Sequence, residues 1–189
     1  AAAGYPRESI DTVLCTHLHV DHVGWNTMLV DGVWLPTFPN ARYLIAAKEW
    51  AYWDANEDES TYGPVLADSV RPVVEAGLVD LVEEDHKLCD EVQLQPTPGH
   101  TPGHVSVHIS ANGSEALITG DCIHHPVQMT KTHWCSSADF DQKQGQKTRE
   151  SLLERYVDED ILIIGTHFAT PTAGHVKHHP QGGYWLAVE

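Results

Sequence analysis

Residues 15–24 carry the side chains best suited to chemistry. They read Cys-Thr-His-Leu-His-Val-Asp-His-Val-Gly and place three histidines and an aspartate within six residues. Imidazole nitrogens and carboxylate oxygens are ligands of Zn²⁺ and related divalent metals. Alternate residues of an extended segment point the same way, so His17 and His19 can hold one ion. Asp21 and His22 follow a turn later and can reach a second ion, so the pattern predicts a metal site directly after the apolar run 12–15.

Three further ligand types follow strand-like segments far along the chain. His100 lies in the Thr-Pro-Gly-His stretch 97–104, after the alternating run 91–95. Asp121 closes the apolar run 116–121, and His167 follows the apolar run 161–166. Functional residues gather on loops that a rigid scaffold positions, so we expect these side chains to join the first cluster.

The order HxHxDH, TPGH, GD and GTH resembles the metallo-β-lactamase superfamily of binuclear metallohydrolases. The nearest resemblance is to the branch of N-acyl-homoserine lactonases and methyl parathion hydrolase-like enzymes, and it runs from about Ile10 to His167. It implies two divalent ions, with Asp121 as the bridging ligand. The expected ligands are His17, His19 and His100 for the first metal, and Asp21, His22 and His167 for the second.

The resemblance also implies an activity, a metal-dependent hydrolase that uses a metal-bridging hydroxide to open a lactone or cleave a related ester. Asp21, Asp121 and His124 are the expected catalytic residues, and Asp21 would relay the proton to the leaving group. The lactonases carry a tyrosine three residues after the bridging aspartate, where this chain has His124. An imidazole there can donate a hydrogen bond to a developing oxyanion. The ligand types favour zinc, with manganese, iron and cobalt left open.

Two other functions stay open at this point. One is phosphotriester or aryl ester hydrolysis within the same superfamily. The other is a metal-binding fragment without useful catalysis, because only about ten residues precede the first metal-binding strand, where family members have several strands. The chain is therefore expected to be an N-terminally incomplete member of the fold.

Two neighbours of the predicted ligands are interpreted as structural. His104 is expected to support the site rather than to ligate a metal. Cys122 could be a second-metal ligand, as a cysteine is in some true β-lactamases of the superfamily. Because Asp121 already occupies the bridging position, Cys122 is read as a buried thiol, and Cys15 as a core residue.

Composition and charge set the wider expectations. The 189 residues are 41% hydrophobic, which suits a single domain over residues 1–189. The formal net charge of −16 would repel phosphate backbones, which argues against a nucleic-acid partner. The N-terminus has no apolar leader and no run is long enough for a membrane helix. We therefore expect a cytoplasmic protein with a small-molecule substrate, no membrane partner, and an exposed sheet edge that could form a homodimer.

Strand-like and helix-like segments alternate, which favours an α/β layered fold. The four-layer αββα arrangement comes from the resemblance. An Asp31-Gly32 hairpin and an Asn112-Gly113 turn are expected from their residue types. Predicted strands include 41–45, 105–109 and the apolar run 161–166, and predicted helices are 48–55, 64–76 and 148–156.

Overall fold

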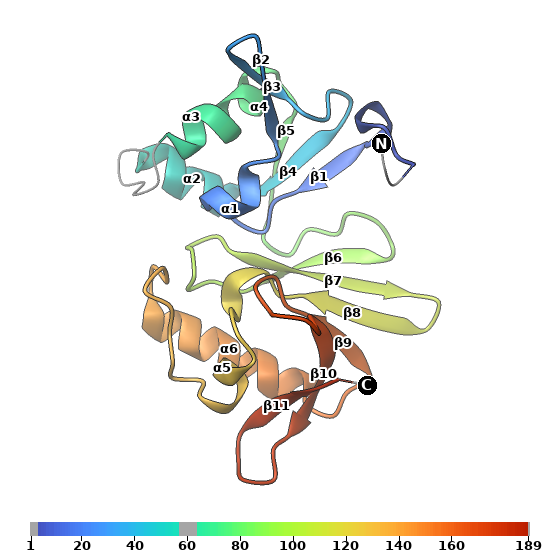
Figure 1. The fold of residues 1–189 in the computed structure, drawn as a ribbon, viewed down its shortest axis with the longest axis vertical. Helices are drawn as coiled ribbons and strands as arrows, with labels where there is room; N and C mark the ends of the chain where they lie inside the picture. Colours follow the sequence, from blue (N-terminus) through green and yellow to red (C-terminus); the bar gives the residue numbers. More distant parts are fainter. Residues whose placement is uncertain (1–3, 57–63, 189) are drawn as a thin grey trace. The chain divides into compact units, whose positions relative to one another are not determined.

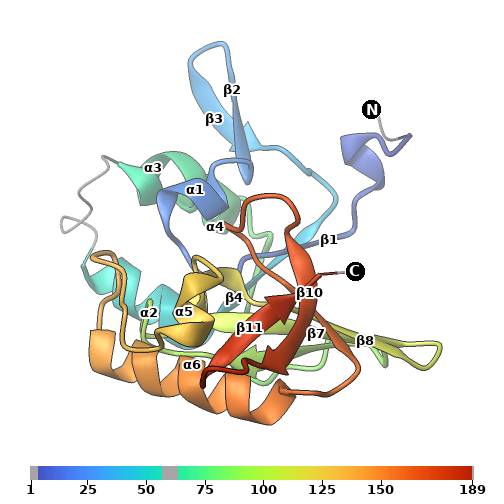
Figure 2. The same ribbon diagram turned by 60° about the horizontal axis from the view of Figure 1, so that its bottom comes forward.

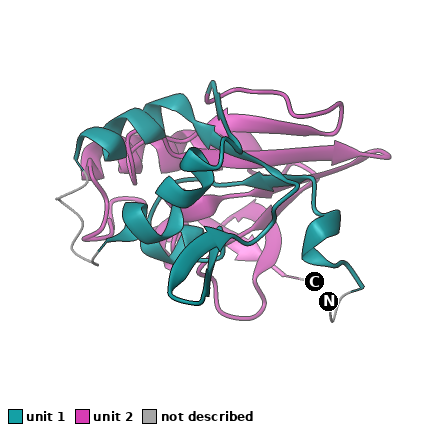
Figure 3. Cartoon of the chain, turned by 90° about the horizontal axis from the view of Figure 1, so that it is seen from above, with its two compact units in different colours: residues 1–83 teal, residues 84–189 magenta. Residues whose placement is uncertain are grey.

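The computed structural model describes residues 4–56 and 64–188, which fold into two compact units (Figure 3). Unit 1 is Ala1–Glu83 and unit 2 is Glu84–Glu189. The single domain expected over residues 1–189 stays a prediction. None of the helices within the described ranges is long and apolar enough to cross a membrane.

Unit 1 is built on a three-stranded parallel sheet in the order β1-β4-β5 (Figure 1). Every residue of β4 after Arg42 is buried, which is the pattern of a central parallel strand covered on both faces. An apolar cluster that includes Leu18, Ile45 and Leu66 forms the core. The elements are β1 (Thr12–Leu14), α1 (Val20–Val23), β2 (Thr27–Val30), β3 (Val33–Pro36), β4 (Arg42–Ala46), α2 (Ala47–Ala55), α3 (Val65–Ser69), α4 (Arg71–Glu75) and β5 (Val79–Val82), after a short 3-10 helix at Arg7–Ser9.

Strands β2 and β3 form the hairpin expected from Asp31-Gly32. Val30 pairs with Val33, so the loop between the strands has two residues. Asp31 has φ of 49° and Gly32 has φ of 82°. Positive φ at both loop residues is the geometry that matches the right-handed twist of a two-residue hairpin.

The helix predicted over residues 64–76 is two helices, α3 and α4, separated at Val70. Pro72 explains the break, because proline lacks an amide proton and its ring clashes with the carbonyl four residues earlier. That carbonyl belongs to Asp68, and the hydroxyl of Thr27 donates to it at 2.7 Å. Gly77 ends α4 with φ of 70°, as its position predicts.

Unit 2 is a six-stranded mixed sheet in the order β11-β10-β9-β8-β7-β6. Only β8 and β9 pair in parallel; the other neighbours are antiparallel. Asn112 and Gly113, with φ of 54° and 78°, form the expected turn between β7 and β8. The elements are β6 (Val92–Pro96), β7 (Val105–Ala111), β8 (Ser114–Ile118), a 3-10 helix (Gly120–Cys122), α5 (Val127–Thr130), α6 (Gln142–Tyr156), β9 (Ile161–Ile164), β10 (Ala173–His178) and β11 (Tyr184–Ala187).

Helix α6 covers one face of this sheet (Figure 2). Its buried Leu152, Leu153 and Tyr156 pack in one cluster with residues of β8 and β9. The helix begins six residues before the predicted start at 148, because Asp141 caps it: the Asp141 side chain accepts a hydrogen bond from the amide of Gln144 at 2.9 Å.

Strands β6, β8 and β9 run in one direction, since β6 and β8 both pair antiparallel with β7 and β8 pairs parallel with β9. Their carboxyl ends therefore lie at the same edge of the sheet. The segments that follow these three ends carry His100, Asp121 and His167. The topology of unit 2 thus brings together three ligand types that are distant in sequence.

Candidate metal centre

The first cluster of candidate ligands follows β1 in unit 1. The ring of His17 lies 4.8 Å from that of His19 and 4.1 Å from that of His22, measured between centroids. Asp21 stands in the first turn of α1, and its carboxylate is 3.5 Å from Nε2 of His22. The structure therefore brings together all four ligands predicted for this half of the centre.

A buried carboxylate on α2 holds this loop in place. Glu49 is fully buried, and one of its oxygens accepts hydrogen bonds from the amide of Leu18 at 3.0 Å and from Nε1 of Trp53 at 2.8 Å. The Trp53 ring packs edge-on against His19, with centroids 5.5 Å apart. Glu49 was not predicted from the sequence, and it positions the backbone between His17 and His19.

Cys15 is a core residue of unit 1, as predicted. Burial raises the pKa of its thiol to about 11, and the side-chain amide of Asn26 donates to the sulfur at 3.4 Å. The group is therefore a neutral thiol at physiological pH.

The second cluster surrounds Asp121 in unit 2. Three imidazole nitrogens face the same oxygen of this buried carboxylate: Nε2 of His167 at 3.0 Å, of His124 at 3.4 Å and of His100 at 3.5 Å. The ligand atoms of His100, Asp121 and His124 all lie within 4.8 Å of one another. His100, Asp121 and His167 were predicted as metal ligands, whereas His124 was predicted only as a catalytic hydrogen-bond donor.

Asp139 orients His100 and was not predicted. Its Oδ1 lies 2.8 Å from Nδ1 of His100, and its Oδ2 accepts the amide of Ser136 at 2.9 Å. Burial acts to raise the pKa of Asp139, but the hydrogen bonds from His100 and Ser136 hold that pKa below its usual range. The carboxylate therefore fixes the proton on Nδ1 of His100 and leaves Nε2, which faces Asp121, as the metal-binding nitrogen.

His104 supports the Asp121 loop. Its Nε2 accepts the backbone amide of Asp121 at 2.9 Å, so its proton lies on Nδ1, 2.8 Å from the hydroxyl of Thr97. The hydroxyl of Ser106 lies 3.0 Å from that of Thr97 and donates to the carbonyl of Thr119 at 2.9 Å. Both ring nitrogens of His104 are thus used within the protein, which agrees with its interpretation as a supporting residue.

The geometry also favours the structural reading of Cys122. Burial raises the pKa of its thiol to about 12, and its sulfur donates to the carbonyl of Thr119 at 3.2 Å. Within the described residues, the groups able to hold a metal do not include this thiol.

The chemistry of the unit 2 cluster fits a divalent metal ion. Neutral imidazole nitrogens that all face one carboxylate oxygen must either carry protons toward it or share a cation with it. Nitrogen and oxygen donors in this combination suit zinc and its first-row neighbours. The roles of the individual residues as ligands stay predictions.

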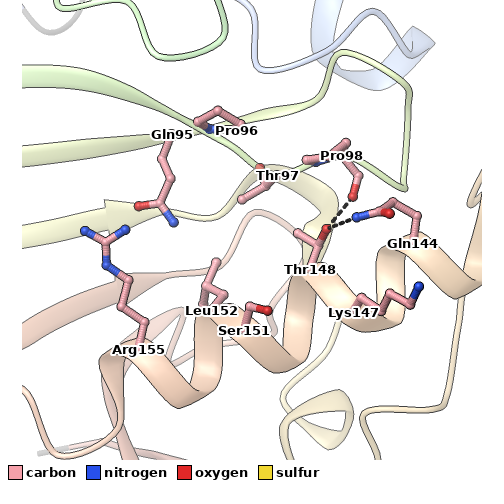
Figure 4. A pocket seen from close by; sticks show the side chains of 10 residues that line it. All are labelled: Gln95, Pro96, Thr97, Pro98, Gln144, Lys147, Thr148, Ser151, Leu152 and Arg155. Atoms are coloured by element: carbon pink, nitrogen blue, oxygen red, sulfur yellow. Dashed lines mark hydrogen bonds between the residues drawn. The ribbon is translucent and has the colours of Figure 1, made fainter.

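A separate pocket of about 310 Å³ lies between the end of β6 and α6 (Figure 4). Its lining contains no histidine, cysteine or carboxylate, so it is not the metal site. Thr148 on its floor donates to the carbonyl of Pro98 at 2.6 Å and fastens the turn before His100 to the helix. The lining residues are Gln95, Pro96, Thr97, Pro98, Gln144, Lys147, Thr148, Ser151, Leu152 and Arg155.

Comparison with known proteins identifies the family. The profile of the Metallo-beta-lactamase superfamily matches residues 1–165, so the chain belongs to this superfamily. This membership, together with the parallel sheet of unit 1, the mixed sheet of unit 2 and their helices, confirms the expected α/β metallo-β-lactamase fold. A search of curated proteins found no match.

Several solved structures share the fold. The hydrolase AbOPH in the beta lactamase superfamily is 26% identical, with a TM-score of 0.84, and the match covers 100% of this chain and 67% of AbOPH. AidC, a dizinc quorum-quenching lactonase in complex with a product, is 22% identical, with a TM-score of 0.78 and the same two coverages, 100% and 67%. A probable metal-dependent hydrolase from Staphylococcus aureus is 21% identical, with a TM-score of 0.75, and the match covers 100% of this chain and 66% of that one. The chain thus spans about two thirds of the length of these proteins.

Proposed function

We propose that the chain is a metal-dependent hydrolase whose two clusters of ligands together hold two divalent ions. Zinc is the preferred ion. The observation that carries the proposal is the convergence of three imidazole nitrogens on the buried Asp121 carboxylate. The first cluster, with its three imidazoles after β1, supports it. Membership of the superfamily and likeness to a dizinc lactonase agree with this reading.

The proposed ligand sets follow the resemblance. By that resemblance, His17, His19 and His100 would hold one ion, Asp21, His22 and His167 would hold the other, and Asp121 would be shared. When bound, two such ions would lower the pKa of a water molecule and polarise the carbonyl or phosphoryl oxygen of the substrate.

The remaining steps belong to side chains of the protein. Asp21 is a half-exposed carboxylate, so it can take a proton and pass it to the leaving group. His124 stands beside Asp121, with its Nε2 3.4 Å from Oδ2 of that carboxylate and a side chain that is partly exposed. Its imidazole would donate a hydrogen bond to a substrate oxygen that gains negative charge.

The proposed substrates are lactones or related esters, because such substrates develop an oxyanion that a cationic site stabilises. Phosphotriesters and aryl esters are the alternative substrates within the same superfamily, and they would use the same groups.

The test is hydrolysis measured on protein stripped of metal and then reloaded with zinc, manganese or cobalt. The panel contains acyl-homoserine lactones, paraoxon-type triesters and nitrophenyl esters, and Asp121→Asn is the matched control. We expect metal-dependent lactone opening that the control lacks. Preference for triesters would move the assignment to the alternative, and metal binding without turnover of any substrate would indicate a metal-binding protein without useful catalysis.

A further inference from the structure

Helix α6 anchors the turn that carries His100. The backbone amide of Asp141 donates to the carbonyl of Gly99 at 2.9 Å, and that of Phe140 donates to the carbonyl of His100 at 3.0 Å. Gly99 has φ of 132°, and a Cβ there would lie 2.3 Å from the amide nitrogen of Gly145. The turn therefore packs backbone against backbone on the first turn of α6, and it requires a glycine at position 99.

One buried cation on the same helix reaches the loop that carries Asp121 and His124. Arg149 is 1% exposed. Its Nε donates to the carbonyl of Cys122 at 3.2 Å, and its Nη1 donates to the carbonyls of Thr132 at 2.7 Å and Trp134 at 3.3 Å. The guanidinium thus fixes the residue after Asp121 and the far end of the loop.

Gln128 extends this contact to His124. Its side-chain oxygen accepts the amide of His124 at 2.7 Å, and its side-chain nitrogen donates to the carbonyl of Trp134 at 2.8 Å, the carbonyl that Arg149 also binds. The position of His124 therefore depends on a backbone segment held by Arg149.

Arg149 also faces the carboxylate that orients His100. Its Nη2 lies 4.0 Å from Oδ2 of Asp139, and both side chains are 1% exposed. A buried carboxylate needs compensation of its charge, and a guanidinium at this distance provides it. The chain of contacts Arg149, Asp139, His100 thus joins the helix to a candidate ligand.

We propose that Arg149 is a positioning residue of the metal centre, which sets the relative places of His100, Asp121 and His124. The proposal rests on the proposed function, because it takes His100 and Asp121 as metal ligands. Arginine suits the role since its planar fork offers five donors in fixed directions, whereas lysine offers a single charged point on a flexible stem.

The experiment compares wild-type protein with Arg149→Lys, Arg149→Met and Asp139→Asn, and with the double variant Arg149→Lys/Asp139→Asn. Lys147→Met, an exposed position two residues away on α6, is the control. Zinc affinity is measured by competition with a chelator, and the geometry of the site by the visible absorption of the cobalt-loaded protein. Circular dichroism of the metal-free proteins reports folding.

We expect Arg149→Lys to weaken zinc binding about 10- to 100-fold, the usual effect of losing a group that orients a ligand. Its cobalt spectrum should change, while Lys147→Met matches wild type in both measurements. Because Arg149 and Asp139 act on the same ligand, the double variant should lose less affinity than the product of the two single losses.

A folded Arg149→Lys variant with wild-type zinc affinity and cobalt spectrum would overturn the proposal. If both Arg149 variants fail to fold, an unchanged cobalt spectrum in the isosteric Asp139→Asn variant would overturn it as well, and an altered one would support it. Failure of the proposed function is distinct, because wild-type protein would then either bind neither zinc nor cobalt or bind them without hydrolysing any substrate of the panel.

Discussion

Asp121 places a single carboxylate oxygen within 3.5 Å of three imidazole nitrogens, and this side chain should be the most sensitive in the centre. Asp121→Ala removes the proposed shared ligand and leaves two cations without the charge that separates them. We expect bound metal to fall from two ions to at most one and activity to fall at least about 100-fold. Metal analysis and kinetics on the same preparation check this, and full metal occupancy in the variant would show that Asp121 is not shared.

The position of His124 allows two roles, a hydrogen-bond donor to the substrate and a metal ligand, and one variant can distinguish them. As a hydrogen-bond donor it acts on the transition state, so His124→Ala should lower kcat by a factor of roughly 10 to 10³ while both metals stay bound. Measured metal content decides how a loss of activity is read. If the variant loses both a bound ion and kcat, His124 is a metal ligand. If kcat is unchanged, His124 has only a packing role.

The candidate ligands, and His104 as a supporting residue, could be recognised in the sequence, but the carboxylates Glu49 and Asp139 that orient the candidate ligands could not. HxHxDH, TPGH, GD and GTH combine unusual residue types with strand ends, whereas Glu49 and Asp139 look like ordinary surface carboxylates. The burial of Arg149 could have been recognised in the sequence. The spacing to Leu152, Leu153 and Tyr156 places Arg149 on the same buried face of the helix. A charged residue on an apolar face indicates a buried partner, and here that partner is the metal-site loop.

At the scale of elements, local chemistry predicted turns better than helix ends. Asp31-Gly32 and Asn112-Gly113 determine their own backbone angles, so both turns are where the residue types predict them. The break between α3 and α4 depends on the single Pro72. The apolar pattern continues through residues 64–76, so it predicts one helix there. The order of the six strands depends on pairings between distant segments, which no local pattern encodes.

Glu49 allows a test of how α2 supports the first metal loop. Glu49→Ala leaves the amide of Leu18 and Nε1 of Trp53 without their acceptor, at a cost of about 1–3 kcal/mol for each buried group. Denaturant unfolding of the metal-free protein should show this loss. The exposed Glu75→Ala on α4 is the control, and equal stability of the two variants would mean that water replaces Glu49 without cost.

At the scale of the whole molecule, the proposed centre couples metal affinity to pH. Histidine ligands must be neutral to bind a metal, and imidazole generally titrates near pH 6.5. Protons therefore compete with metal below that value, so zinc affinity and hydrolysis should fall together as pH drops toward 5. Parallel titrations of binding and rate check this, and activity that persists at pH 5 after the metal has dissociated would contradict a metal-dependent reaction.

The net charge of −16 argues against a nucleic-acid partner, since an acidic surface repels phosphate backbones, and a small-molecule substrate stays a prediction. The cytoplasmic location and a homodimer stay predictions. The superfamily profile matches residues 1–165, a range that includes every proposed ligand except His167. That histidine follows β9, whose parallel pairing with β8 brings it to Asp121.

The most direct test of the account is the number of metal ions bound per chain. Protein purified without chelator, saturated with zinc and freed of excess ion should contain two ions per chain by elemental analysis. The control His104→Gln alters a supporting residue and should keep the capacity for two. A wild-type stoichiometry that never exceeds one ion would contradict the binuclear centre.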